Sequence, residues 1–168
     1  MAIISAYCDG GVIGRNPSSI GGTWAYVFVD ENDQKVAGSS NRVLVGDAPW
    51  LMPRITNNFT ELLGALKAME ALPDGWDGTI YTDSQVTYRR IIRGSSFAGI
   101  PSCMEEMVRH HRKRLSHRVV LISGHPSEKD LRLGVTKKGR MCSKWNVACD
   151  RQCTQLVNVY RKEMRRQS

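Results

Sequence analysis

The sequence predicts an α/β fold, a five-stranded mixed sheet with an antiparallel N-terminal hairpin portion and flanking helices. Three observations predict it. Strand-like segments rich in apolar and β-branched residues follow one another in the first 45 residues, with loop and turn sequences between them. Helical spacing of apolar residues begins after residue 56, and two further strand-like segments lie among the helical ones. The expected order of elements is therefore β-β-β-α-β-α-α-β-α. Strands joined through helices usually pair in parallel, so the later strands are expected to add a parallel part to the sheet.

The N-terminal third is expected to form strands at residues 3–9, 23–30 and 34–45. The first strand ends at Asp9, and Gly10 and Gly11 after it allow another group to approach the backbone closely. Glycine, proline, asparagine and serine predict a loop before the second strand, and Glu31–Asp33 predicts a hairpin turn after it. Residues 46–56, with two prolines, are expected to connect this hairpin to the first helix.

The middle of the chain predicts a helix, a strand and a second helix. The first helix begins at a cap formed by Asn57 or Asn58 and ends before Pro73, and its apolar residues recur at steps of three and four. The strand spans residues 78–82, and the second helix runs from Asp83–Ser84 to about Arg93.

The C-terminal part is expected to contain a helix at 102–115, a strand at 118–123 and a last helix from about Trp145. The stretch between Gly124 and Ser143 is rich in Lys, Arg and Gly and has no pattern of regular structure. We therefore expect one domain over residues 1–168, with a basic loop at about 126–143 and a basic tail at about 161–168.

Charge is distributed unevenly along the chain. Residues 1–100 contain 8 Lys/Arg and 10 Asp/Glu, whereas residues 101–168 contain 16 Lys/Arg and 6 Asp/Glu, and the net charge is +8. A basic half beside an acidic one favours a nucleic-acid partner, because basic groups release the counterions of phosphates. The alternative is a solubilising surface with a basic tail.

The cysteines and the apolar segments argue against three classes of protein: disulfide-rich secreted, membrane-spanning and zinc-binding. The odd number of cysteines and the lack of a secretory signal argue against a disulfide framework and favour a cytoplasmic protein. No apolar run approaches the roughly 20 residues of a membrane span. Cys142, Cys149, Cys153 and His125 could form a zinc site, but buried free thiols are favoured, because no CxxC pair is present. We expect a monomer.

Four acids from separate elements are candidates for a metal site: Asp9, Glu61, Asp83 and Asp150. Mg²⁺ prefers a few carboxylates with water and substrate oxygens, and two such ions can hydrolyse a phosphodiester. Each acid also has a structural explanation: a turn for Asp9, a capping box with Asn58 for Glu61, a helix N-cap for Asp83 and the helix dipole for Asp150. The set, more than any single acid, favours a metal-dependent nuclease.

The acids lie in short motifs: TNNFTELLGALKAMEAL contains Glu61, IYTDSQ contains Asp83 and AYCDGG contains Asp9. These motifs resemble those of the type 1 ribonucleases H, namely the family's TNN-x-x-EL helix, its strand ending in TDSQ and its first strand. SGHP is similar to the loop with the catalytic histidine, and NVACDRQC to the N-x-x-x-D pattern of the last helix. The resemblance covers residues 3 to about 155.

The resemblance implies endonucleolytic hydrolysis of the RNA strand of an RNA–DNA hybrid, leaving 5′-phosphate and 3′-hydroxyl ends. Asp9, Glu61, Asp83 and Asp150 would bind two Mg²⁺ or Mn²⁺ ions, and His125 would assist proton transfer or product release. The resemblance also implies substrate contacts. In the minor groove these would be made by Asn58, Ser84 and Gln85 and by the backbone of Gly10 and Gly11. Thr56 and Asn57 would contact the DNA strand.

The chain departs from the family in its basic regions. The protrusion that many bacterial members use to hold the hybrid is missing between Arg93 and Pro101, and the loop between His125 and Asp150 is enlarged. We expect this loop, through Lys137, Lys138 and Arg140, and the segment 109–118 to bind the DNA strand instead; an inert loop is the alternative. Competing functions are a junction resolvase or exonuclease of the same fold, and a non-catalytic nucleic-acid-binding domain.

Overall fold

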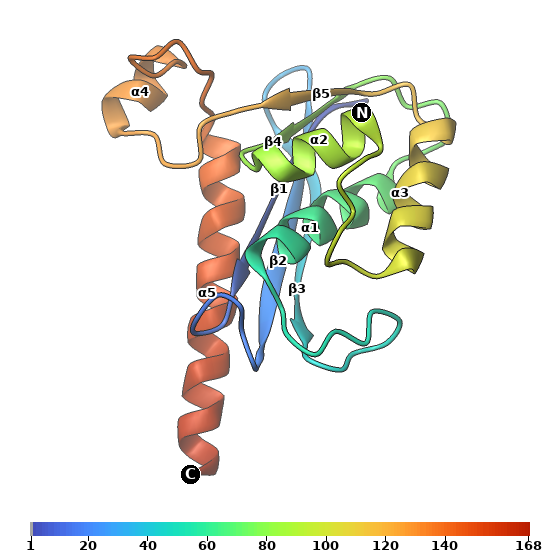
Figure 1. The fold of residues 1–168 in the computed structure, drawn as a ribbon. Helices are drawn as coiled ribbons and strands as arrows, with labels where there is room; N and C mark the ends of the chain where they lie inside the picture. The colour runs from blue at the N-terminus through green and yellow to red at the C-terminus, as the bar shows by residue number, and fades with distance from the viewer. Residues whose placement is uncertain (1) are drawn as a thin grey trace.

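The protein is described by a computed structural model over residues 2–168, shown in Figure 1. Five strands form a single sheet in the order β3-β2-β1-β4-β5. The strands are β1 (Ile3–Val12), β2 (Gly21–Asp30), β3 (Lys35–Leu44), β4 (Thr79–Thr82) and β5 (Arg118–Leu121). The helices are α1 (Asn57–Ala71), α2 (Gln85–Arg93), α3 (Ser102–Arg114), α4 (Glu128–Leu133) and α5 (Lys144–Gln167).

The sheet is mixed, and β1 lies between its antiparallel and its parallel part. β2 pairs antiparallel with both β1 and β3, whereas β4 pairs parallel with both β1 and β5. This confirms the predicted five-stranded mixed sheet with an antiparallel hairpin portion. The pairing changes from antiparallel to parallel because short connections without helices join β1 to β2 and β2 to β3, whereas helices lie between β3, β4 and β5.

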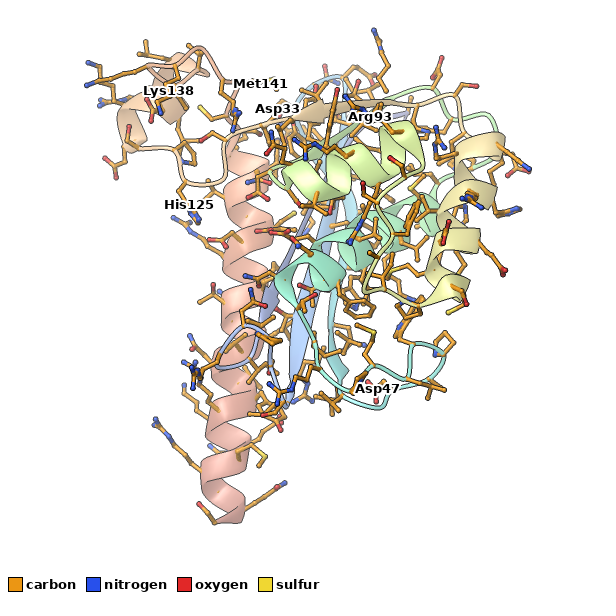
Figure 2. All side chains as sticks on the ribbon, in the orientation of Figure 1. Asp33, Asp47, Arg93, His125, Lys138 and Met141 are labelled. Carbon is orange, nitrogen blue, oxygen red and sulfur yellow. The ribbon has the colours of Figure 1, made fainter. Side chains whose placement is uncertain are left out.

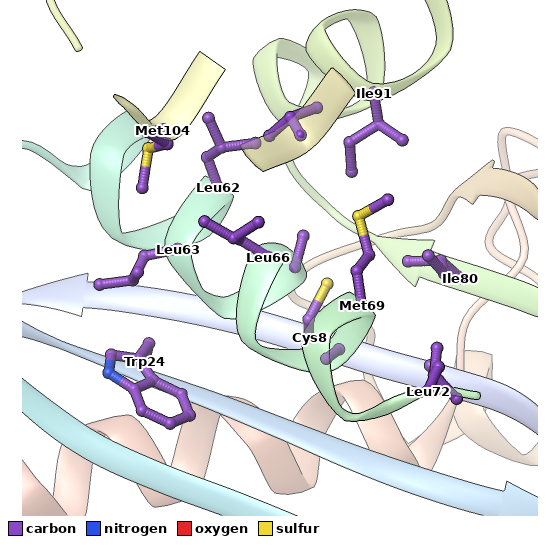
Figure 3. Packing of buried hydrophobic residues seen from close by; sticks show 14 of the residues in the cluster. Cys8, Trp24, Leu62, Leu63, Leu66, Met69, Leu72, Ile80, Ile91 and Met104 are labelled. Carbon is purple, nitrogen blue, oxygen red and sulfur yellow. The ribbon is translucent and has the colours of Figure 1, made fainter. Parts of the chain in front are cut away.

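Helices cover both faces of the sheet (Figure 1). On one face, α1 packs on β1 and β2 and forms the larger apolar core with α2 and α3, part of which Figure 3 shows. On the other face, Cys149 and Cys153 of α5 pack in a second core against Tyr7 of β1 and Ala25, Val27 and Val29 of β2. Side chains alternate along β1, so Ala6 and Cys8 belong to the α1 core and Tyr7 to the α5 core.

Several element boundaries differ from the sequence prediction. The cap of α1 is Thr56, whose side chain accepts a hydrogen bond from the Phe59 amide, so the prediction of Asn57 or Asn58 was wrong. β1 continues through Gly10 and Gly11 to Val12, because these glycines pair with Trp24 and Thr23 of β2. The helix α5 continues to Gln167, so the basic residues after 160 lie on a helix.

The stretch from Gly124 to Ser143, which had no predicted structure, contains the short helix α4. A capping box between Ser127 and Asp130 begins this helix, and Gly134 in a left-handed conformation ends it. None of the helices within residues 2–168 has the length and apolarity that crossing a membrane requires.

Candidate active site

Three carboxylates meet beside the centre of the sheet. One oxygen each from Asp9, Glu61 and Asp83 lies within 4.8 Å of the others, although these residues come from β1, α1 and the end of β4. Such a set of hard oxygen ligands suits a divalent cation of the Mg²⁺ type.

Strand register brings Asp9 beside Asp83. β1 and β4 run parallel with Tyr7 opposite Tyr81, and each acid follows two residues later along the chain. β4 ends at Thr82, whereas β1 continues beside β2 with Asp9 opposite Ala25. The prediction that Asp9 ends its strand was therefore wrong, and the acids meet where β4 leaves β1.

Two glycines bring Glu61 to the same point. A Cβ added to Gly10 would lie 2.3 Å from the carbonyl carbon of Thr60 and 2.5 Å from the Glu61 amide nitrogen. A Cβ added to Gly64 would lie 2.5 Å from the Asp9 carbonyl oxygen. The backbones of α1 and β1 thus touch at their crossing, which is possible only without side chains at both positions.

A third glycine and an asparagine hold Asp83. A Cβ added to Gly124 would lie 2.6 Å from the Asp83 Oδ2, so any larger residue would displace the carboxylate. The Asn146 amide of α5 donates a hydrogen bond to the same oxygen at 3.4 Å. Asn146 is fully buried, and its own Oδ1 has no hydrogen-bond partner among the described residues. The sequence motif included Asn146 but gave it no role.

The cluster is electrostatically unfavourable without a cation. Burial and the nearby Asp83 carboxylate raise the pKa of Asp9 to about 8. Burial also raises the pKa of Glu61 to about 7, although a hydrogen bond from Ser84 opposes this effect. Burial raises the pKa of Asp83, which the Asn146 hydrogen bond and the charge of His125 partly lower. A divalent cation would favour the ionised forms and remove this penalty.

Asp150 and His125 lie near the three acids but outside their 4.8 Å group. The charge of Asp150, on the second turn of α5, raises the pKa of both Asp9 and Asp83. His125 lies in the connection between β5 and α4, and its side chain is exposed (Figure 2). Both residues therefore act electrostatically on the cluster.

The structural explanations offered for the acids do not fit. Because Thr56 caps α1, Glu61 lies at the fifth helical position and cannot complete a capping box. Ser84 caps α2, with its hydroxyl accepting from the Thr87 amide, so Asp83 is not the cap. Asp150 is the seventh residue of α5, beyond the first turn where the helix dipole acts. Asp9 lies within a strand and opens no turn.

The thiols form no metal site with His125 in the part of the chain that the structure describes. All five cysteines are free, and the candidate metal group there consists of carboxylates. Cys149 donates its S–H to the Tyr7 carbonyl, and Cys142 donates to the Asp130 carbonyl. These thiols are packed into local structure, as the favoured prediction had it.

The expected substrate contacts lie around the cluster on several elements. Asn58 and Gln85 are exposed in the first turns of α1 and α2, and Arg90 donates to the Asn58 carbonyl from α2. The Asn57 amide donates to the Asn16 side chain at 3.2 Å. Lys137, Lys138 and Arg140 are exposed in the stretch after α4, where Figure 2 labels Lys138.

Solved structures of ribonucleases H share this fold. LC11-RNase H1, isolated from compost by a metagenomic approach, is 20% identical with a TM-score of 0.64, over 95% of this chain and 99% of that chain. LC11-RNase H1 in complex with an RNA/DNA hybrid gives 19% identity and a TM-score of 0.62, over 93% and 97%. RNase H1 of the halophilic archaeon Halobacterium salinarum NRC-1 is 16% identical with a TM-score of 0.60, over 92% and 96%.

These similarities confirm, at the level of the fold, the resemblance to ribonucleases H that the motifs indicated. No family profile matches the sequence, and no curated protein sequence is significantly similar to it.

Proposed function

We propose that this protein is a metal-dependent endoribonuclease that hydrolyses the RNA strand of RNA–DNA hybrids and leaves 5′-phosphate and 3′-hydroxyl ends. The observation that carries the proposal is the meeting of Asp9, Glu61 and Asp83 within 4.8 Å on a ribonuclease H fold. A structure of one neighbour with this fold contains an RNA/DNA hybrid, which supports the same substrate here.

The residues present fit a divalent cation, and we infer that the site binds a pair of Mg²⁺ ions, for which Mn²⁺ would substitute. Three converging carboxylates supply hard oxygen ligands, and Asp150 is proposed as the fourth ligand because its charge already acts on Asp9 and Asp83. When bound, the ions would activate a water molecule and stabilise the leaving oxygen. The protein's own contribution is to hold the carboxylates at fixed positions through Gly10, Gly64 and Gly124.

His125 is proposed to move a proton at the leaving oxygen or to assist product release. It is exposed and lies close enough to lower the pKa of Asp83 through its charge. An exposed imidazole in a connection without regular structure can reach both bound substrate and solvent.

Recognition of RNA is proposed for groups in the first turns of the two helices that flank the cluster. Asn58, Ser84 and Gln85, with the backbone of Gly10 and Gly11, would contact the minor groove, where the 2′-hydroxyls distinguish RNA from DNA. Thr56 and Asn57 at the start of α1 would contact the DNA strand. Lys137, Lys138 and Arg140 would contact the nucleic-acid backbone. We propose a cytoplasmic monomer.

A cleavage panel tests the proposal against its alternatives. Labelled RNA–DNA hybrid, double-stranded RNA, double-stranded DNA and a four-way junction are incubated with the protein and Mg²⁺, or with EDTA. Cleavage of the RNA strand of the hybrid alone, abolished by EDTA, is the expected result. Cleavage of the junction or of DNA ends would indicate a resolvase or an exonuclease, and binding without cleavage would indicate a non-catalytic domain.

A further inference from the structure

We propose that residues Ser127–Cys142, termed here the basic module, form a folded phosphate-binding site that holds a backbone phosphate of the nucleic acid next to the cleavage point. This inference rests on the proposed function and deepens it, because it names a single pocket and a ligand group. Three features of the molecule support it: the local structure of the module, its charge, and its position relative to the three acids.

The module is an ordered unit closed by its own hydrogen bonds. After α4, the Thr136 amide donates to the Arg140 carbonyl at 2.8 Å, which places Lys137 and Lys138 at the tip of a turn. Val135 pairs with Met141, and Cys142 closes the unit through its amide to Gly134 and its thiol to the Asp130 carbonyl. The lysines therefore project from a fixed turn.

The module contains a pocket of about 490 Å³ with an excess of positive charge. Four basic residues line it: Lys129, Lys137, Lys138 and Arg140. Asp130 also lines the pocket, but its carboxylate accepts the Ser127 amide in the capping box. Hydrogen bonds from Ser127, and then the charges of Lys137 and Lys129, lower the pKa of Asp130. One carboxylate thus faces four basic groups, which leaves a net positive charge to bind a phosphate.

The pocket adjoins the acid cluster through two consecutive residues. Ser123 lines the pocket, and Gly124 lies against the Asp83 carboxylate. The Ser123 amide also donates to the Met141 carbonyl at 2.9 Å, which fixes the module to the end of β5. Consecutive Cα atoms lie about 3.8 Å apart, so one edge of the pocket lies beside the acid cluster.

The basic residues of α3 do not extend this pocket. Arg109, Arg112 and Lys113 lie on α3, and Figure 1 shows α3 and α4 at opposite sides of the molecule. The phosphate contact is therefore local to the module and is expected to show as one defined position along the nucleic acid, in contrast to diffuse attraction by a basic surface.

The test measures binding of hybrids in which one phosphate at a time is neutral. Hybrids with a single methylphosphonate, placed in turn along the RNA strand or along the DNA strand, are bound to the Asp83→Asn protein, with and without Lys137→Gln, Lys138→Gln and Arg140→Gln. The matched control is Lys162→Gln, Arg165→Gln and Arg166→Gln, which removes the same charge from the other end of α5 (Figure 1).

The module variant is expected to bind unmodified hybrid about tenfold more weakly, with a salt dependence smaller by about 0.9 for each phosphate that the protein no longer neutralises. One neutral phosphate should weaken binding to the protein with an intact module by the same factor and leave binding to the variant unaffected. The position of that phosphate shows whether the module binds the RNA strand or the DNA strand. Purely additive losses at every position, or an equal loss in the control, would overturn the proposal. Hybrid cleavage by the wild-type protein, measured in parallel, reports separately on the proposed function.

Discussion

The acid cluster and the basic module lie on either side of Gly124, but they are held in place differently. The cluster depends on contacts between distant parts of the chain: Gly10 against α1, Gly64 against β1, and Gly124 against Asp83. The module depends on contacts within 16 residues of sequence, from the Ser127 capping box to the Cys142 amide. The proposed metal chemistry is thus placed on the core, and the proposed phosphate contact is placed on a locally folded surface unit.

The largest expected effect comes from removing a carboxylate of the cluster. Asp83→Asn keeps the size of the side chain but removes a charge proposed to bind metal, and we expect hybrid cleavage to fall by about 10³-fold or more. The circular dichroism spectrum should stay unchanged and hybrid binding should persist. Retained cleavage would show that Asp83 has a structural role only.

Gly10→Ala tests the crossing of α1 and β1. The new methyl group would meet backbone atoms of Thr60 and Glu61, which cannot move aside, so we expect a loss of about 3 kcal/mol in the free energy of unfolding. Urea denaturation measures it. The matched control is Gly11→Ala, whose methyl group would have its nearest neighbour at 3.4 Å and should cost much less. Equal losses for the two variants would show that the close crossing does not limit stability.

Asn146→Ala tests how α5 supports the cluster. Loss of the amide leaves the Asp83 Oδ2 without its donor, and supporting groups of this kind typically change metal affinity by roughly 10–100-fold. The Mg²⁺ concentration for half-maximal cleavage should rise by this factor, with a smaller change at saturating Mg²⁺. A loss of stability with an unchanged Mg²⁺ requirement would mean that Asn146 only fills space.

The pH dependence of stability is expected to come from the acid cluster. The pKa of Asp9 is raised to about 8 and that of Glu61 to about 7, so the metal-free folded state holds protons that the unfolded state has released. Its stability should therefore fall as pH rises from about 5 to 8. At pH 8, Asp9→Asn should stabilise the metal-free protein by on the order of 1 kcal/mol. Thermal unfolding in EDTA measures both effects, and a flat profile would contradict them.

The smallest expected effect is on the stability of the module variant. Lys137, Lys138 and Arg140 are exposed side chains, so their replacement by Gln should change the free energy of unfolding by less than about 0.5 kcal/mol. Thermal unfolding at low and high salt measures this. A large loss would show that the module is bound to the core through these side chains, and the contrast between the two regions would disappear.

Sequence patterns predicted the features that depend on local chemistry. The apolar spacing along α1 and the β-branched and aromatic residues of β2 indicated the element types, and the TNN-x-x-EL and TDSQ motifs pointed to Glu61 and Asp83. The capping box at Ser127 was also readable as S-x-x-D, but the prediction did not use it, because Lys, Arg and Gly dominate that stretch.

Features that depend on distant contacts were not predictable. Gly10 and Gly11 indicated that another group could approach closely, but nothing in the sequence identifies α1 and Gly64 as the partner. Asn146 is one asparagine among several polar residues of a helix start. The continuation of β1 past Asp9 depends on pairing with β2, a separate segment further along the chain. The cap of α1 is Thr56, so the chain enters the helix one or two residues earlier than the asparagines suggested.

The hydrogen bond from Ser123 to Met141 has a consequence for the history and engineering of this chain. It places the entry and the exit of residues 127–140 side by side, so this stretch can be exchanged for a shorter or a differently charged one while β5 and α5 keep their places. The strands that carry Asp9 and Asp83 have no such freedom, because a single-residue slip would turn either carboxylate to the opposite face. We therefore expect natural variation, and successful grafting, to be concentrated in residues 127–140, with the register of β1 and β4 unchanged.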